Sequence, residues 1–102
     1  MFIELEIDNA TYNLTFAGRM VPQYFSEVAD ENFWRVLTNE QRWCGADLRA
    51  LVYSGCKTAI PEIKPSQAAA MIREDTVDTI RAALREAAGL AIEALRMPQL
   101  LM

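Results

Sequence analysis

The sequence predicts a mainly α-helical α+β domain, in which an N-terminal antiparallel β-hairpin packs on a bundle of about five helices. Two alternating apolar segments begin the chain, several segments with helical apolar spacing follow, and a long alanine-rich segment comes last. A length of 102 residues suits one domain with one core. We therefore expect a single domain over 1–102, with the hairpin in 1–16, helices in 20–97 and an apolar tail in 98–102.

The hairpin is predicted from two segments with the period of two that is typical of strands with one buried face. Apolar and polar residues alternate in 3–7 (IELEI) and in 12–16 (YNLTF), and the turn-forming segment 8–11 (DNAT) lies between them. We expect the register that gathers all six apolar side chains on one face. Its pairs are Ile7 with Tyr12, Leu5 with Leu14, and Ile3 with Phe16.

Proline, glycine and cap residues divide the middle of the chain into helices. Pro22 fits the first turn of a first helix, where no N–H donor is needed. Asp30 is the expected N-cap of the second helix, and Gly45 is expected to break the chain before a third helix in 47–57. Pro65 then begins a short fourth helix.

The last helix is expected from about Thr76 to Arg96, with Pro98 as its end because proline rarely continues a helix. One stripe of apolar residues at helical spacing predicts its buried face. The stripe consists of Val77, Ile80, Leu84, Ala87, Ala88, Ala91 and Leu95. Gly89 and the alanines beside it leave little side-chain bulk, which would permit a close approach of another helix.

Further apolar residues of the last helix lie off this stripe. They predict either that the helix is buried on two sides within the domain, or that its second side contacts another molecule. With the apolar tail they form the candidate partner-binding set, and a homo-oligomer through this helix is left open. The set is Leu90, Ile92, Met97, Leu100 and Leu101.

The composition predicts no catalytic, metal or cofactor site. The chain has no histidine, which is the commonest general base and the usual zinc ligand. The four glycines are scattered and form no phosphate-binding loop. A net charge of −4 disfavours nucleic acid as a partner, and no apolar stretch approaches the roughly 18–20 residues of a membrane span.

Cys44 and Cys56 are the only reactive side chains that a small enzyme would use. No secretion signal is recognisable at the N-terminus, so we expect both thiols to be reduced, as in a cytoplasm. Cys56 lies between Gly55 and Lys57, where a nucleophilic thiol is one interpretation. No general base accompanies it, so a small apolar residue at a helix end is the interpretation that we favour.

The aromatic residues and arginines between positions 24 and 49 have two interpretations. The aromatic cluster suits a binding platform, but such residues more often belong to the core. It consists of Tyr24, Phe25, Phe33, Trp34 and Trp43.

Arginines recur every seven residues, which suits a basic stripe, but acidic residues surround them and a solvated mixed face is expected. They are Arg35, Arg42 and Arg49.

Two segments and their order resemble a known family. The first is 12–19 (YNLTFAGR) and the second is 46–55 (ADLRALVYSG). A proline-marked loop, a short helix that begins with serine and a long alanine-rich helix follow them. In this order and spacing the chain resembles the small tail assembly chaperones of long-tailed bacteriophages and prophages.

The resemblance implies a non-enzymatic role in virion morphogenesis. Proteins of this family coat the long helical tape measure protein, keep it soluble, recruit tail tube subunits and leave before the tail is complete. It therefore implies the tape measure protein and the tail tube protein as partners, in the host bacterial cytoplasm and not in the mature virion.

Two other classes of protein remain open on the residues alone. One is a small acidic adaptor or regulatory module that binds a protein, including a homodimer through the last helix. The other is a small enzyme with Cys56 as its nucleophile.

Overall fold

The structure, a computed structural model, describes the backbone of residues 2–101 and the side chains of residues 2–95. It confirms the predicted fold class, because an antiparallel hairpin packs on five helices. The strands are β1 (Ile3–Ile7) and β2 (Ala10–Leu14). The helices are α1 (Val21–Ser26), α2 (Phe33–Leu37), α3 (Gly45–Lys57), α4 (Pro65–Met71) and α5 (Val77–Leu101), with a 3-10 turn at Glu40–Arg42.

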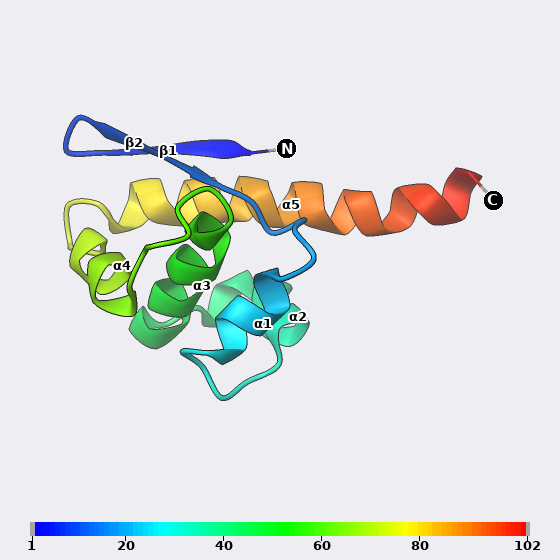
Figure 1. Ribbon diagram of the computed structural model, residues 1–102, viewed down its shortest axis with the longest axis horizontal. Coiled ribbons are helices and arrows are strands. Elements are labelled where there is room, and N and C mark those ends of the chain that lie inside the picture. Colours follow the sequence, from blue (N-terminus) through cyan, green and yellow to red (C-terminus); the bar gives the residue numbers. More distant parts are fainter. Residues whose placement is uncertain (1, 102) are drawn as a thin grey trace.

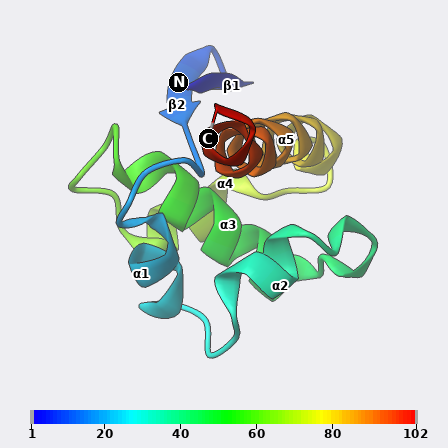
Figure 2. The same ribbon diagram turned by 90° about the vertical axis from the view of Figure 1, so that its right-hand side faces the viewer.

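The long helix α5 is the middle layer of the molecule. The hairpin lies on one side of α5, and α3 with the other short helices lies on the opposite side (Figures 1 and 2). The C-terminal end of α5 projects beyond all the other elements (Figure 1). A helix of this length spans about 37 Å, which accounts for most of the longest dimension, 43 Å. Within the described part of the chain, no helix has both the length and the apolar character that a membrane crossing needs.

The hairpin has a register that differs by two residues from the predicted one. Its pairs are Ile3 with Leu14, Leu5 with Tyr12, and Ile7 with Ala10. The cause is a two-residue turn, in which Asp8 and Asn9 both have positive φ angles, 53° and 65°. That turn type suits Asp and Asn and matches the twist of the strands. A shift by two keeps each side chain on its face, so the apolar face survives, and Phe16 leaves the sheet for the core.

The predicted starts of α2 and α3 are wrong because other side chains cap these helices. The N-cap of α2 is Asn32 and not Asp30, and the Asn32 side chain accepts a hydrogen bond of 3.0 Å from the backbone three residues later. Gly45 does not break the chain and is the first residue of α3. The N–H of Cys44 donates to the Asp47 carboxylate at 3.1 Å, as in a capping box.

The predicted end of α5 and part of its buried face are also wrong. The helical backbone passes Pro98 and ends at Leu101. The fixed φ of proline is compatible with a helix, although its nitrogen donates no hydrogen bond and its ring crowds the preceding turn. Leu95 is 54% exposed, although it has the spacing of the buried stripe. A Cβ atom on Gly89 would meet nothing within 4 Å, so no other helix approaches at that point. The other predicted stripe residues are buried or half-buried.

The predicted aromatic core is largely confirmed. Phe25, Phe33 and Trp43 are buried, and the Trp43 indole N–H donates to the carbonyl of Val36 at 2.7 Å. Tyr24 and Trp34 are half-buried at its border. The cluster therefore fills the space between α1, α2 and α3, and only its border reaches the surface.

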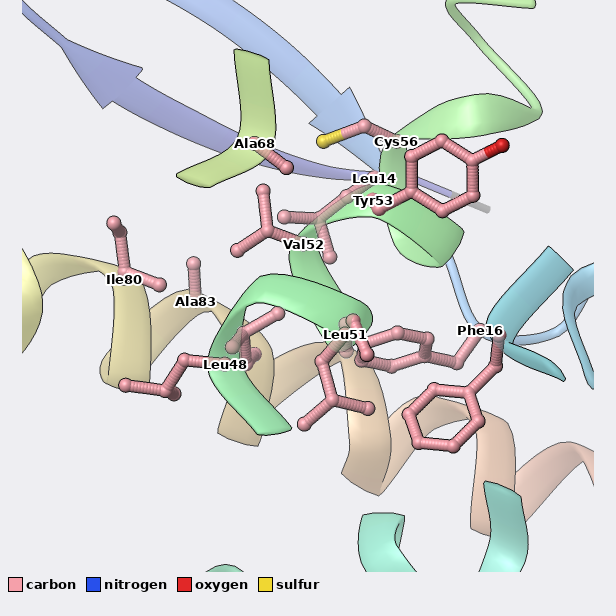
Figure 3. Packing of buried hydrophobic residues seen from close by; sticks show 14 of the residues in the cluster. Leu14, Phe16, Leu48, Leu51, Val52, Tyr53, Cys56, Ala68, Ile80 and Ala83 are labelled. Atoms are coloured by element: carbon pink, nitrogen blue, oxygen red, sulfur yellow. The ribbon is translucent and has the colours of Figure 1, made fainter. Parts of the chain in front are cut away.

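The end of β2 crosses directly over the end of α3 at Gly55. The N–H of Thr15 donates to the carbonyl of Gly55 at 2.9 Å. A Cβ atom on Gly55 would lie 3.0 Å from the ring of Phe16, which is only 1% exposed. Figure 3 shows Leu14 and Phe16 packed with side chains of α3 in this part of the core. The two segments of the family resemblance therefore meet here, and glycine permits the contact.

We predict opposite effects of the same substitution at two glycines. Gly89→Ala is expected to raise the free energy of unfolding by about 0.5–1 kcal/mol, because alanine is the better residue in an open helix. Gly55→Ala must displace the buried Phe16 ring and is expected to lower the free energy of unfolding by about 1–3 kcal/mol. Urea denaturation of both variants measures the difference. An equal gain in both variants would show that the contact of Phe16 with Gly55 is not tight.

Candidate functional site

Three large apolar side chains are exposed in, or next in sequence to, segments that line two grooves on α5. Among residues 2–95 they are Phe2 at 47%, Met20 at 45% and Leu95 at 54%. Leu95 is in the projecting part of α5 and lines a groove with Arg19, the neighbour of Met20. Phe2 precedes Ile3, which lines a second groove against α5. Exposed apolar side chains that gather in this way often mark a site of contact with another protein.

The first groove lies between α5 and the segment that leads into α1. It has a volume of about 270 Å³, and its large lining side chains include Trp34 and Leu95. Ala91 and Ala94 also line it and contribute little bulk. Arg19 is the only charged side chain among the described residues that line it.

The second groove lies between β1 and the same part of α5. It is small, about 50 Å³, and Ile3, Leu14 and Leu90 contribute its large apolar side chains. It shares Ala17, Ala91 and Ala94 with the first groove, so the two grooves lie on either side of the place where the segment after β2 meets α5. We refer to both grooves as the α5-end surface.

The predicted partner-binding residues fall only partly on this surface. Leu90 is half-buried and lines the second groove. Ile92 is also half-buried but lines neither groove. The side chains of Met97, Leu100 and Leu101 lie outside the described residues.

Sequence reasoning did not assign Arg19, Leu95 or the exposed Phe2 and Met20 to a site, and it named Trp34 only within the aromatic cluster for which the core was favoured. Leu95 has the spacing of the buried stripe, and only the lengths of the covering elements expose it. Two signals in the sequence could have indicated exposed apolar side chains. Phe2 is an apolar residue directly before a strand, and Met20 is one directly before a helix.

A polar groove of about 230 Å³ lies between α2 and the start of α3. Two arginines and two carboxylates line it, which are Arg35, Arg42, Glu31 and Asp47. Asp47 already accepts the hydrogen bond that caps α3. This groove therefore carries charges of both signs. The three arginines of the predicted stripe, Arg35, Arg42 and Arg49, are all exposed to solvent, as expected of a mixed solvated face.

The two cysteines occupy different environments. Cys56 is fully buried in the core, and burial raises the pKa of its thiol to about 12. At neutral pH it is therefore a neutral thiol, and its packing supports the role of a small apolar residue. Cys44 is exposed at the start of α3, with its sulfur 3.4 Å from a carboxylate oxygen of Asp47.

Surface ion pairs attach short elements to both flanks of α5. The Arg73 guanidinium, just before α5, donates two hydrogen bonds of 3.0 Å to Asp8 in the hairpin turn. Arg73 also lowers the pKa of Asp75. On α5 itself, Arg85 donates to Glu40 at 2.6 Å and lowers the pKa of that carboxyl. A lowered carboxyl pKa stabilises the fold above the unfolded-state pKa, and this contribution is lost as the pH falls through the folded-state pKa.

The described residues contain no group of three His, Cys, Asp or Glu side chains that could hold a metal ion. Every buried side-chain nitrogen and oxygen in this part of the chain has a hydrogen-bond partner. The α5-end surface is therefore the feature of the described molecule that invites a functional interpretation.

Comparisons with protein-family models, with curated proteins and with solved structures give no match for this chain. The family resemblance therefore stays a prediction, and it rests on the two segments 12–19 and 46–55.

We predict that a thiol reagent at about pH 8 modifies one cysteine of the folded protein and two of the unfolded protein. Cys44 reacts because it is exposed, whereas buried Cys56 becomes accessible only in urea. The absorbance of released thionitrobenzoate counts the thiols. Cys44→Ser should remove the fast reaction, and a fast reaction that remains in this folded variant would contradict the burial of Cys56.

Proposed function

We propose that this chain is a tail assembly chaperone of a long-tailed bacteriophage or prophage. It binds the tape measure protein, keeps it soluble and promotes assembly of the tail tube, without enzymatic activity. The observation that carries the proposal is that the two resembling segments form one structural unit. Thr15 bonds to Gly55 across them, and Phe16 packs on the same glycine.

The residue types in the second segment have physical roles that explain their spacing. Leu48 and Leu51 face the core, and Gly55 admits the end of β2. Tyr53 donates a hydrogen bond of 2.7 Å to Glu27, which follows α1. Asp47 caps the helix. The pattern therefore describes a way of joining a hairpin to helices, which gives the resembling residues a structural reason for their spacing.

The α5-end surface suits the proposed client. A tape measure protein exposes long apolar helices before assembly, which need reversible shielding from water. An apolar surface with shallow grooves can bind the apolar face of a helix without enclosing it. Many copies that each bind weakly along one extended client would hold it firmly through avidity.

The proposed setting is the host bacterial cytoplasm, where the client is synthesised. The chaperone leaves before the tail is complete and is absent from the mature virion. The free thiols of Cys44 and Cys56 suit a reducing compartment.

A second candidate function is a small acidic adaptor that binds one partner through one interface, including a homodimer through α5. The groove beside the exposed Leu95 offers one such interface. The number of copies bound to each client separates the two candidates.

We predict that co-expression with the tape measure protein encoded beside it raises the soluble amount of that client. Light scattering on the purified complex should give many copies of this chain per client, because each copy covers only a short apolar helix. Arg49→Glu, a change on an exposed residue that lines neither groove, should behave as the wild type. No rise in soluble client would refute the chaperone function, and one or two copies per client would favour the adaptor.

A further inference from the structure

We propose that the open edge of β1 is a strand-pairing site for another protein. It accepts an extended segment that carries basic side chains at every second position, and it rejects a second copy of this chain. The inference does not depend on the proposed function, because it concerns the hairpin and an extended partner and not the α5-end surface.

The hairpin has one closed edge and one open edge. In the described chain the sheet consists of β1 and β2, so each strand has one side that the other does not cover. The side of β2 is closed by α3, because the N–H of Thr15 donates to the carbonyl of Gly55. The open side belongs to β1, which packs against α5 through its buried face.

The backbone groups along the open edge are those of Glu4 and Glu6. In an antiparallel pair, every second residue exchanges hydrogen bonds with the opposite strand, and the residues between them point away. The two-residue turn makes Ile7 and Ala10 a bonded pair, so Leu5 also bonds to β2. The N–H and C=O groups of Glu4 and Glu6 therefore point outward, and no described backbone group outside the hairpin bonds to them. Such a row of unpaired groups is a template for another strand.

The side chains of the same two residues determine which strand suits the edge. Glu4 and Glu6 are exposed, and neither belongs to the ion pairs within residues 2–95. Asp8, the third carboxylate of the hairpin, already pairs with Arg73. Opposite charges on directly facing residues stabilise a pair of strands. A strand with lysine or arginine opposite each glutamate therefore suits this edge.

The neighbouring flank of α5 is also acidic. The second groove places Ala87 and Ala94 of α5 beside β1. Glu86 and Glu93 each lie one residue, about 100° of helix rotation, from these alanines, and both are exposed. Arg85 points to another side of the helix, where it donates to the 3-10 turn. The surroundings of the edge therefore favour a basic partner.

The same geometry disfavours a second copy of this chain. When two β1 edges pair in antiparallel fashion, the outward-pointing residues of one copy face those of the other. Glu4 then faces Glu6, or one of these residues faces itself in the other copy. Like charges in directly opposite positions destabilise the pair, and charged edges protect sheets from edge-to-edge association. A strand from a different protein can supply the opposite charge.

The test uses the synthetic peptide Thr-Lys-Val-Lys-Val-Lys-Thr and two derivatives that differ only in the position of one N-methyl group. On the central lysine this group removes a donor that faces β1, and on a neighbouring valine it removes a donor that points away. Binding is measured by NMR titration of the isotope-labelled chain. We expect the parent and the valine derivative to shift and protect the amides of Glu4 and Glu6, and the lysine derivative to bind at least about tenfold more weakly.

Two double variants and one further peptide test the role of charge. Glu4→Gln with Glu6→Gln should weaken binding of the parent peptide at least about threefold. Asp30→Asn with Glu31→Gln makes the same change of charge at exposed residues before α2 and should bind like the wild type. Thermal melts of both variants should match the wild type, because the changed side chains are exposed. The peptide with glutamate in place of lysine represents a second copy of β1 and should not bind.

Hydrogen exchange of the free protein tests whether the edge is open. The amides of Glu4 and Glu6 should exchange fast, while the amide of Leu5 is protected by its bond to β2. Slow exchange at all three would show that the edge is already covered and would overturn the inference.

Three binding results would also overturn it. They are equal binding of the two methylated peptides, equal binding of the glutamate and lysine peptides, and no binding of the parent at concentrations up to about 1 mM. None of these measurements involves the tape measure protein, so a failure here leaves the proposed function standing.

Discussion

The close contact between the end of β2 and Gly55 of α3 is the constraint on which the arrangement of layers depends. The hydrogen bond from Thr15 to Gly55 and the ring of Phe16 on the same glycine hold a strand end against a helix end. The hairpin and α3 are thereby joined on one side, and α5 packs between them (Figure 2). An added methyl group at Gly55 would crowd the Phe16 ring at 3.0 Å, whereas the open position of Gly89 tolerates one.

This arrangement explains why one end of α5 is exposed. The hairpin and α3 are short, and they cover the apolar stripe of α5 only as far as Ala91. Leu95 continues the stripe and is 54% exposed, and the segment that leads into α1 adds Arg19 to the same groove. The interior packing therefore creates the surface that we propose as the binding site for a client helix.

Much of the fold is predictable from the sequence because it depends on local periodicity. The alternation in 3–7 predicts a strand, and the stripe that includes Ile80 and Leu84 predicts the face of α5 that is buried. The register of the hairpin was wrong by two because it depends on the backbone of the two-residue turn, which a pattern of apolar residues does not report. The candidate site was found only in part, since the exposure of Leu95 depends on how far other elements extend over α5. That distance is a property of the packed molecule and not of the segment around Leu95.

The measurement that tests the central contact most directly is native-state hydrogen exchange at the amide of Thr15. If the crossing of β2 over α3 joins the layers, this amide should exchange only by global unfolding, with an opening free energy equal to that of the α3 core. Fast exchange at Thr15 while the amides of α3 remain protected would show that the hairpin opens by itself, and it would contradict the dependence of the layers on this contact.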